Sequence, residues 1–345
     1  MEKEKKSKSN KSIIISVVIA VVALALGGAI WCFLKVTQKY SGEDIRIYIP
    51  HGASDDAIAD TLSLRLGEDF GGAVYDIWRL RRKDEPSLRG SYVIKEGMSA
   101  FDVSRKLVSG NQDPIRFTFN NLRTLDQLAQ RIGYKFELSP ADFLVACDSV
   151  LSSEGMKKEE YPAAFMPDTY DFYWDASPDF VVRTLYAYRN RFWNDERKMK
   201  AEKLGLSPVE VATVASIVEE ETVKSDERPK VARLYLNRLN RGMKLQADPT
   251  VKFAVGDFGL RRITGAHLSV DSPYNTYKYA GLPPGPIRIP DGRSIDAVLS
   301  APPHPYIYMC AKEDFSGYHN FASSDAEHMA NARRYHRALN QRGIK

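Results

Sequence analysis

Hydrophobic positions along the chain follow three different spacings. Residues 12–34 form an unbroken run of 23 residues without a charge, which as a helix can cross a hydrocarbon core of ~30 Å. Between residues 44 and 135, short alternating runs are followed by turns and by apolar residues at helical spacing. From residue 136 to residue 345, helical spacing prevails and irregular loops interrupt it. The pattern predicts an α+β protein with a membrane helix, a β-turn-α region and a mixed α+β domain.

The β-turn-α pattern occurs three times in the region 44–135. Each unit begins with an alternating run, at residues 45–49, 91–94 and 115–119, and continues through a turn to a Ser or Thr that can cap a helix. The middle unit, residues 90–112, resembles a LysM module, a small fold that binds glycan chains. A small α+β scaffold without a ligand of its own is an equally good interpretation of the same pattern.

The region after residue 136 begins with an aromatic segment, FMPDTYDFYW at residues 165–174. Such a cluster packs in a core, clasps a loop or, in a glycan-binding protein, provides a surface for sugar rings. A long amphipathic helix is predicted from about Phe180 to Lys203. The next helix begins at Pro208, with Ser207 as its N-cap.

Three consecutive glutamates, Glu219–Glu221, end the apolar helix that begins at Pro208. At ~100° per residue, Glu219 borders the apolar face, Glu221 borders its opposite edge, and Glu220 points towards solvent. A carboxyl group beside an apolar cleft can stay partly protonated near neutral pH, which is the state that a general acid needs. This geometry favours Glu219, and the alternative is that the three glutamates are only a solvated charge run.

The chain after these glutamates combines a second helix with polar loops. The helix is predicted at Glu227–Leu239, and the segment that follows places Gln246 and Asp248 two residues apart on an extended stretch. Their side chains would point the same way and could bind sugar hydroxyls or orient a catalytic acid. Two irregular loops then suggest function, although their residues could equally serve to pin turns. These loops are residues 272–277 (SPYNTY) and 281–286 (GLPPGP).

The charge distribution argues for a membrane anchor and against a nucleic-acid partner. The formal net charge is +5, but the tail of residues 1–11 and Lys35 account for most of it, so the remainder is nearly neutral. Arg79–Asp84 is the densest basic cluster and is interpreted as a solvated helix face, so no basic face for nucleic acid remains. By the positive-inside rule, the basic tail stays in the cytoplasm and the chain beyond the span is exported. A cleaved signal peptide is the rival interpretation, against which Trp31–Leu34 is a poor cleavage site.

Cysteine and histidine usage predicts neither a disulfide framework nor a metal site. Outside the span only Cys147 and Cys310 remain, and two buried free thiols are favoured over a bridge between them. The six histidines show no spacing typical of metal ligands, so we expect no metal and no cofactor.

Several motifs in one order resemble the MltG-type (YceG-like) endolytic murein transglycosylases. The similarity extends from about Ile45 to the C-terminus, and the anchor fits too. In that family the catalytic acid is the first glutamate after Ser-Ile-Val, which here is Glu219. The family motif commonly reads Glu-Lys-Glu, whereas this chain has three glutamates. The motifs are FMPDTYDF, SIVEEET, VARLYLNRLNRGMKLQADPT, YNTY, GLPPGPI and HNF.

The resemblance implies a single-pass protein of the plasma membrane whose catalytic domain, residues 136–345, cuts peptidoglycan outside the cytoplasm. Glu219 would protonate the glycosidic oxygen between N-acetylmuramic acid and N-acetylglucosamine. As a carboxylate it would then deprotonate the 6-hydroxyl of the muramic acid, which closes a 1,6-anhydro ring. Peptidoglycan strands are the implied partner, and cell wall synthesis proteins remain open as further partners. The residues expected to support Glu219 or bind substrate are Glu221, Gln246, Asp248, Asn275 and Tyr277.

Two other functions fit the same sequence. A membrane-anchored scaffold that binds peptidoglycan without cutting it would keep the loops but would not need a carboxylate at position 219. A conventional hydrolase would need a second carboxylate facing Glu219, and Asp248 is the candidate. The products distinguish the three: anhydro-muramic ends indicate a transglycosylase, reducing ends a hydrolase, and no product a scaffold.

Overall fold

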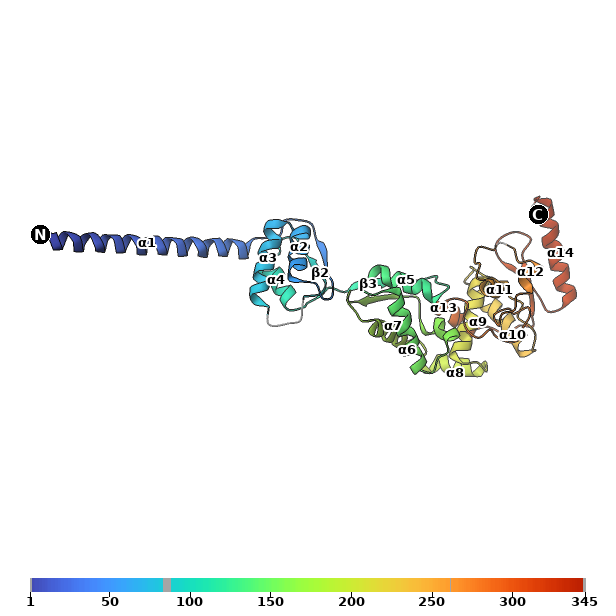
Figure 1. Ribbon diagram of the computed structural model, residues 1–345. Coiled ribbons are helices and arrows are strands. Elements are labelled where there is room, and N and C mark those ends of the chain that lie inside the picture. The colour runs from blue at the N-terminus through green and yellow to red at the C-terminus, as the bar shows by residue number, and fades with distance from the viewer. Residues whose placement is uncertain (1, 83–87, 261, 344–345) are drawn as a thin grey trace. The chain divides into compact units, whose positions relative to one another are not determined.

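The computed structural model describes residues 2–82, 88–260 and 262–343 (Figure 1). Its contacts divide the chain into two units. The first contains Met1–Ile115 and Asp171–Asp175, and the second contains Arg116–Tyr170 and Ala176–Lys345. This division falls before residue 116, whereas the sequence suggested a boundary after residue 135.

The first unit begins with one long helix, α1 (Glu2–Thr37). Its part Ile14–Thr37 has the length and composition of a membrane span, and none of that stretch is buried inside the protein. An apolar helix that finds no protein core to cover it is compatible with a single-pass membrane anchor.

The rest of the first unit is a small α+β fold. Strand β1 (Ile45–Ile49) pairs antiparallel with β2 (Gly90–Ile94), and Ile47 lies opposite Tyr92. Ser54 and Ser99 cap two helices as predicted, because their hydroxyls accept hydrogen bonds from the first helical turns. The helices that pack around the strands are α2 (Asp55–Leu66), α3 (Glu68–Arg81) and α4 (Ala100–Val108).

The segment 90–112 does not form a module with a core of its own. It contains β2 and α4, whose Tyr92 and Val103 share one hydrophobic core with Ile47, Leu62 and Trp78 from the preceding elements. The predicted LysM-like module at these residues is therefore not confirmed. Part of the cluster Arg79–Asp84 lies outside the described residues, and its described part is the exposed end of α3.

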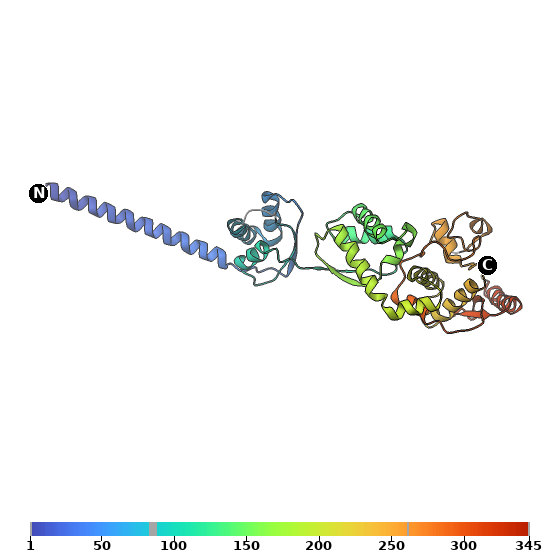
Figure 2. The same cartoon turned by 90° about the horizontal axis from the view of Figure 1, so that it is seen from below.

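The first half of the second unit consists mainly of helices, and a two-stranded sheet lies at its start (Figure 2). Strand β3 (Ile115–Thr118) pairs with β4 (Thr169–Phe172). Aromatic side chains such as Phe119, Phe143 and Phe165 fill the space behind it. The helices are α5 (Leu125–Lys135), α6 (Pro140–Ser153), the 3₁₀-helix η1 (Lys158–Ala164) and α7 (Pro178–Phe192).

The long helix predicted from Phe180 to Lys203 is wrong, since the structure has two helices there. Helix α7 ends at Phe192, and α8 (Asp195–Lys203) begins after a break. Trp193 leaves the helical conformation and is 1% exposed, so its side chain anchors the break in the core. The Asn194 side chain then caps α8 by accepting from the N–H of Arg197 at 3.0 Å.

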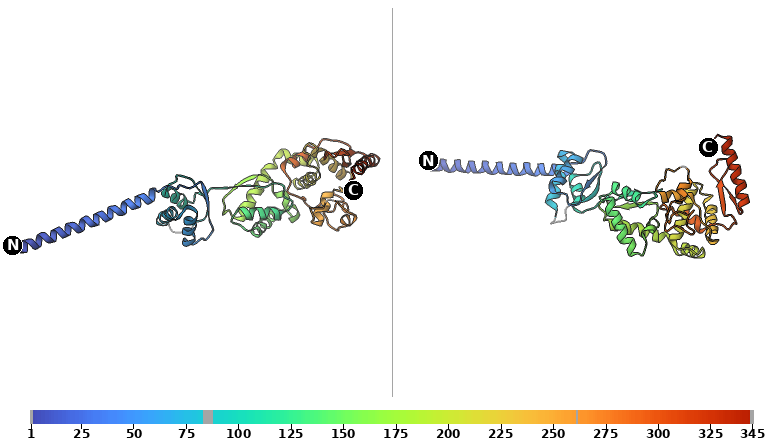
Figure 3. Two further views of the ribbon diagram at one scale, coloured as in Figure 1. Left: turned by 90° about the horizontal axis from the view of Figure 1, so that it is seen from above. Right: turned by 45° about the vertical axis from the view of Figure 1, so that its right-hand side comes forward.

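Helix α9 (Pro208–Glu221) is the central element of the second half. Every residue from Val211 to Val218 is buried, as expected of a helix that is apolar or small on all sides. It is packed by α8, α10 (Arg228–Asn240), α11 (Asp248–Val255) and α13 (Gly292–Leu299), while the short α12 (Gly265–Leu268) lies against α11. A closing hairpin of β5 (Tyr308–Ala311) and β6 (His319–Ala322) carries the last helix, α14 (Asp325–Gln341), on its side (Figure 3).

The two cysteines that follow α1 are both free in the described structure. Cys147 on α6 is buried, and burial raises the pKa of its thiol well above the ordinary value. Cys310 on β5 is half-buried rather than buried as expected. The described structure is therefore stabilised by hydrophobic packing and not by a disulfide.

Candidate active site at the end of α9

The three glutamates at the end of α9 enter three different environments. Ser207 and Glu210 form a capping box at its first turn, and the N–H of Thr222 bonds to the carbonyl of Val218 at its last. Because successive residues turn by ~100°, Glu219 and Glu221 leave the helix on roughly opposite sides. The helix thus directs each of the three carboxylates towards a different set of partners.

Glu220 lies in a buried ion-pair network and does not point to solvent as predicted. Its carboxylate receives two bonds from Arg123, at 3.1 and 3.0 Å, and one from Arg288 at 2.8 Å. Its side chain is only 16% exposed. The prediction failed because the chain around residue 288 covers a helix face that would be solvated in an isolated helix.

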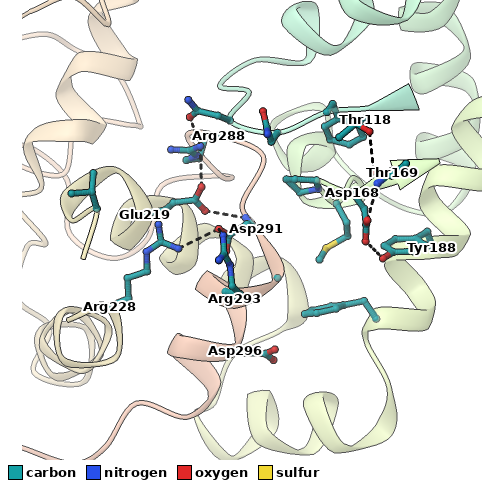
Figure 4. Close-up of a pocket in the computed structure, with 18 residues that line it drawn as sticks. Thr118, Asp168, Thr169, Tyr188, Glu219, Arg228, Arg288, Asp291, Arg293 and Asp296 are labelled. Atoms are coloured by element: carbon teal, nitrogen blue, oxygen red, sulfur yellow. Dashed lines mark hydrogen bonds and ion pairs between the residues drawn. The ribbon is translucent and has the colours of Figure 1, made fainter. Parts of the chain in front are cut away.

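Glu219 shares Arg288 with Glu220. One carboxylate oxygen of Glu219 lies 2.9 Å from the Arg288 guanidinium, and the other accepts from the N–H of Asp291 at 2.9 Å (Figure 4). Burial raises the pKa of Glu219 above its ordinary value, and the charge of Arg288 and the N–H of Asp291 offset only part of this shift. Both oxygens accept hydrogen bonds, which fix the position of the carboxyl group.

Glu221 is half-buried and forms no ion pair within the described part of the chain. Burial raises its pKa to about 7, helped by the charge of Asp248 and opposed by His319 and a hydrogen bond from Tyr235. A carboxyl group with this pKa is protonated in a substantial fraction of molecules at neutral pH. It meets the requirement for a general acid that can later accept a proton.

The predicted supporting residues gather beside Glu221. The hydroxyl of Tyr277 donates to Asp248 at 2.7 Å, and both residues interact electrostatically with Glu221. Asp248 is the first residue of α11, so Gln246 and Asp248 do not lie on one extended stretch as predicted. Gln246 instead has a left-handed backbone (φ 51°), a strained conformation for a residue other than glycine, and its side-chain oxygen accepts from Arg238 at 3.3 Å.

Asn275 supports this cluster from below. It is fully buried, and its amide donates to the carbonyls of Leu268 and Val270 at 2.9 and 2.8 Å. Its side-chain oxygen accepts from the N–H of Tyr277 at 3.1 Å. Asn275 therefore fixes the loop that carries Tyr277, and its own polar atoms do not face a substrate.

A buried pair that sequence analysis missed closes the cluster. Glu227 is 5% exposed and accepts from the ring Nδ1 and the backbone N–H of His319, both at 2.8 Å, and from the hydroxyl of Thr222 at 3.1 Å. Burial lowers the pKa of His319, but the hydrogen bond and the charge of Glu227 together raise it by more. The net shift of the His319 pKa is therefore upward. Only the HNF motif hinted at His319, because the two partners lie 92 residues apart in sequence.

An open cleft of about 890 Å³ lies on the Glu219 side of α9. One wall carries Glu219, Arg288 and Asp291, and the other carries Asp168 and Tyr188 (Figure 4). The exposed side chain of Val223, just after the end of α9, lies on its rim. The end of α9 therefore separates two polar sites, the cluster around Glu221 and this cleft.

Comparisons with a family profile, with known sequences and with solved structures all point to the same family. The profile of the YceG-like family matches residues 47–334. An endolytic murein transglycosylase of Bacillus subtilis is 29% identical over 313 residues, which are 84% of this chain and 86% of that protein. One from Streptococcus pneumoniae is 26% identical over 328 residues, covering 84% of this chain and 59% of that protein. The crystal structure of a YceG-like protein from Listeria monocytogenes matches with a TM-score of 0.56 and 28% identity, over 84% of this chain and 98% of that one.

Proposed function

Because the chain belongs to the YceG-like family, we propose that it is a lytic transglycosylase that cuts the glycan strands of peptidoglycan. The relatives from Bacillus subtilis and Streptococcus pneumoniae carry the name endolytic murein transglycosylase. The observation that supports a mechanism is the half-buried Glu221, whose pKa of about 7 suits an acid that must also act as a base.

We further propose that Glu221, rather than the predicted Glu219, is this acid. Both oxygens of Glu219 are engaged by Arg288 and Asp291, so a proton on Glu219 would have to displace a strong hydrogen bond. Glu221 forms no ion pair in the described structure, accepts a hydrogen bond from the neutral hydroxyl of Tyr235, and lies beside Asp248 and Tyr277. The residues predicted to position the acid thus surround Glu221 and not Glu219.

The reaction needs one carboxyl group because the substrate supplies its own nucleophile. Protonated Glu221 gives its proton to the oxygen between C1 of N-acetylmuramic acid and O4 of N-acetylglucosamine, and the C1–O4 bond breaks. The Glu221 carboxylate then takes the proton of the muramic acid 6-hydroxyl, whose oxygen bonds to C1 and closes the 1,6-anhydro ring. No water is consumed, and Glu221 ends protonated as it began.

Neighbouring groups are suited to stabilise the two charges that develop during this reaction. C1 becomes positively charged as its bond breaks, as in other glycosidic cleavages. The carboxylate of Asp248, held by Tyr277 at 2.7 Å, is suited to stabilise that charge. The cationic form of His319, held by Glu227, stabilises the Glu221 carboxylate that remains after proton transfer.

The products of a peptidoglycan digest test this function. We expect the full-length protein in detergent to release fragments that end in 1,6-anhydro-N-acetylmuramic acid, detected by mass spectrometry. Fragments with reducing muramic acid ends would instead indicate a hydrolase, with Asp248 activating water. Tight binding without any product would favour the scaffold.

The pH dependence of the reaction follows from the pKa of Glu221. The acid must be protonated, so kcat/KM should fall as the pH rises through about 7. His319→Gln removes a cation that lowers the pKa of Glu221, so this alkaline limb should move to higher pH. The measurement is the pH–rate profile on soluble glycan strands, with His336→Gln on the exposed side of α14 as the control. An alkaline limb that stays in place in His319→Gln would contradict the assignment of Glu221.

Helix α1 is proposed to anchor the enzyme with its N-terminus in the cytoplasm. The apolar length of Ile14–Thr37 and the lysines before it support this orientation. In cells stripped of their wall, added protease should digest the region after α1 and spare an epitope placed at the N-terminus. Loss of that epitope would show the opposite orientation.

A further inference from the structure

The cleft on the Glu219 side of α9 has no part in the chemistry proposed for Glu221. It is a large open space of about 890 Å³ that lies entirely within the second unit. Val223 joins the two sites, since it lies on the rim of the cleft, is 85% exposed, and follows Glu221 by two residues.

Most charges on the α9 side of the cleft are neutralised by partners. Glu219 pairs with Arg288, Asp291 pairs with Arg228 at 3.2 Å, and Asp296 receives two bonds from Arg197 at 2.8 and 3.0 Å. Such pairs keep spare acceptor and donor positions but offer little net charge. The wall therefore suits a ligand with many hydroxyl and amide groups and does not suit a strongly charged one.

The opposite wall adds further hydrogen-bonding groups and aromatic surface. It includes residues 166–169 of the segment 165–174, and its aromatic rings come from Phe119 and from α7. Asp168 is exposed and accepts from the hydroxyl of Tyr188, and the hydroxyls of Thr118 and Thr169 lie 2.8 Å apart (Figure 4). Tyr188 and Phe192 contribute half-buried aromatic rings. Rings beside paired carboxylates and hydroxyls match the faces and edges of uncharged sugars.

We propose that this cleft binds the glycan strand at sugars remote from the bond that is cut. The inference rests on the proposed function, because an enzyme that cuts inside a strand must hold sugars beyond the broken bond. The occupant is a run of N-acetylated sugars, whose hydroxyl and acetamido groups fit the paired walls. Tyr188 and Asp168 are its principal contacts, since they lie opposite the ion pairs.

The test measures binding in full-length protein that carries Glu221→Gln, so that the strand is not cut. The probes are purified glycan strands and single disaccharides, titrated by calorimetry in detergent. Tyr188→Ala and Asp168→Ala should weaken strand binding about tenfold and leave disaccharide binding unchanged. Tyr186→Ala is the matched control, because Tyr186 is also a half-buried tyrosine on α7 but lies outside the cleft lining.

Thermal unfolding of each variant separates a lost contact from a lost fold. Folded Tyr188→Ala protein that binds strands as tightly as the Tyr186→Ala control would overturn the inference. In active protein, the same cleft variants should raise KM for strands and leave kcat within about twofold. Failure of the proposed function would show differently, as a wild-type digest without anhydro ends, whatever the cleft variants bind.

Discussion

Replacing Glu221 by Gln should lower the turnover of peptidoglycan by about 10³-fold, within the range that loss of a general acid or base produces. The amide can keep a hydrogen bond to Tyr235 but can neither give nor take the proton that the reaction moves. Release of anhydro-muramic ends, followed over time by mass spectrometry, gives the rate. A near-native unfolding temperature would show that the fold is retained.

Glu219→Gln is the matched variant, since Glu219 lies two residues before Glu221 on α9 and the substitution is equally isosteric. We expect its turnover to stay within about tenfold of the wild type, because Glu219 takes no part in the proposed proton transfer. The opposite pattern, an inactive Glu219→Gln and an active Glu221→Gln, would return the acid to the residue that the sequence predicted. Two inactive variants with native stability would mean that both carboxylates take part.

Replacing Arg288 by Met should lower the free energy of unfolding by about 3–5 kcal/mol, since it leaves buried carboxylates without their cation. Arg288 is 7% exposed and bonds to Glu219, Glu220 and the side chain of Asn121, the last at 2.7 Å. Met fills a similar volume but supplies no charge. Denaturant unfolding of the second unit, followed by tryptophan fluorescence, measures the loss.

Two further variants identify the cause of this loss. Arg123 is 35% exposed, so Arg123→Met should cost only about 1 kcal/mol. Adding Glu219→Gln to Arg288→Met should recover part of the stability, because one unpaired charge disappears. Equal losses from Arg123→Met and Arg288→Met, or no recovery in the double variant, would show that packing and not charge explains the effect.

Sequence patterns predicted elements whose signals are local. Ser207 and Ser99 cap helices that begin where expected, because a capping hydroxyl bonds within three residues of itself. The helical period does not predict the break between α7 and α8, because the break depends on the burial of Trp193 in the tertiary core. The sequence likewise predicts an exposed Glu220, because the arginines that cover it come from distant segments and leave no local pattern.

The sequence predicts which residues belong to the candidate site, but it does not predict which of them contact one another. Glu219, Glu221, Asp248 and Tyr277 were all named from the sequence, yet helix geometry alone could not tell which carboxylate meets the other residues. That choice depends on Arg288, which comes from a loop 68 residues further along the chain and engages both Glu219 and Glu220. The pairing of Glu227 with His319 is equally non-local, so no short sequence pattern predicts it.

The buried pair of Glu227 and His319 also has a consequence for the order in which the protein is made. The ribosome supplies residues from the N-terminus, so Glu221, Asp248 and Tyr277 emerge before His319 does. Until β6 has been synthesised and has folded back onto the start of α10, Glu227 lacks its partner and the cluster remains unfinished. A glycan-cutting enzyme assembled in this way stays incomplete during most of its own synthesis.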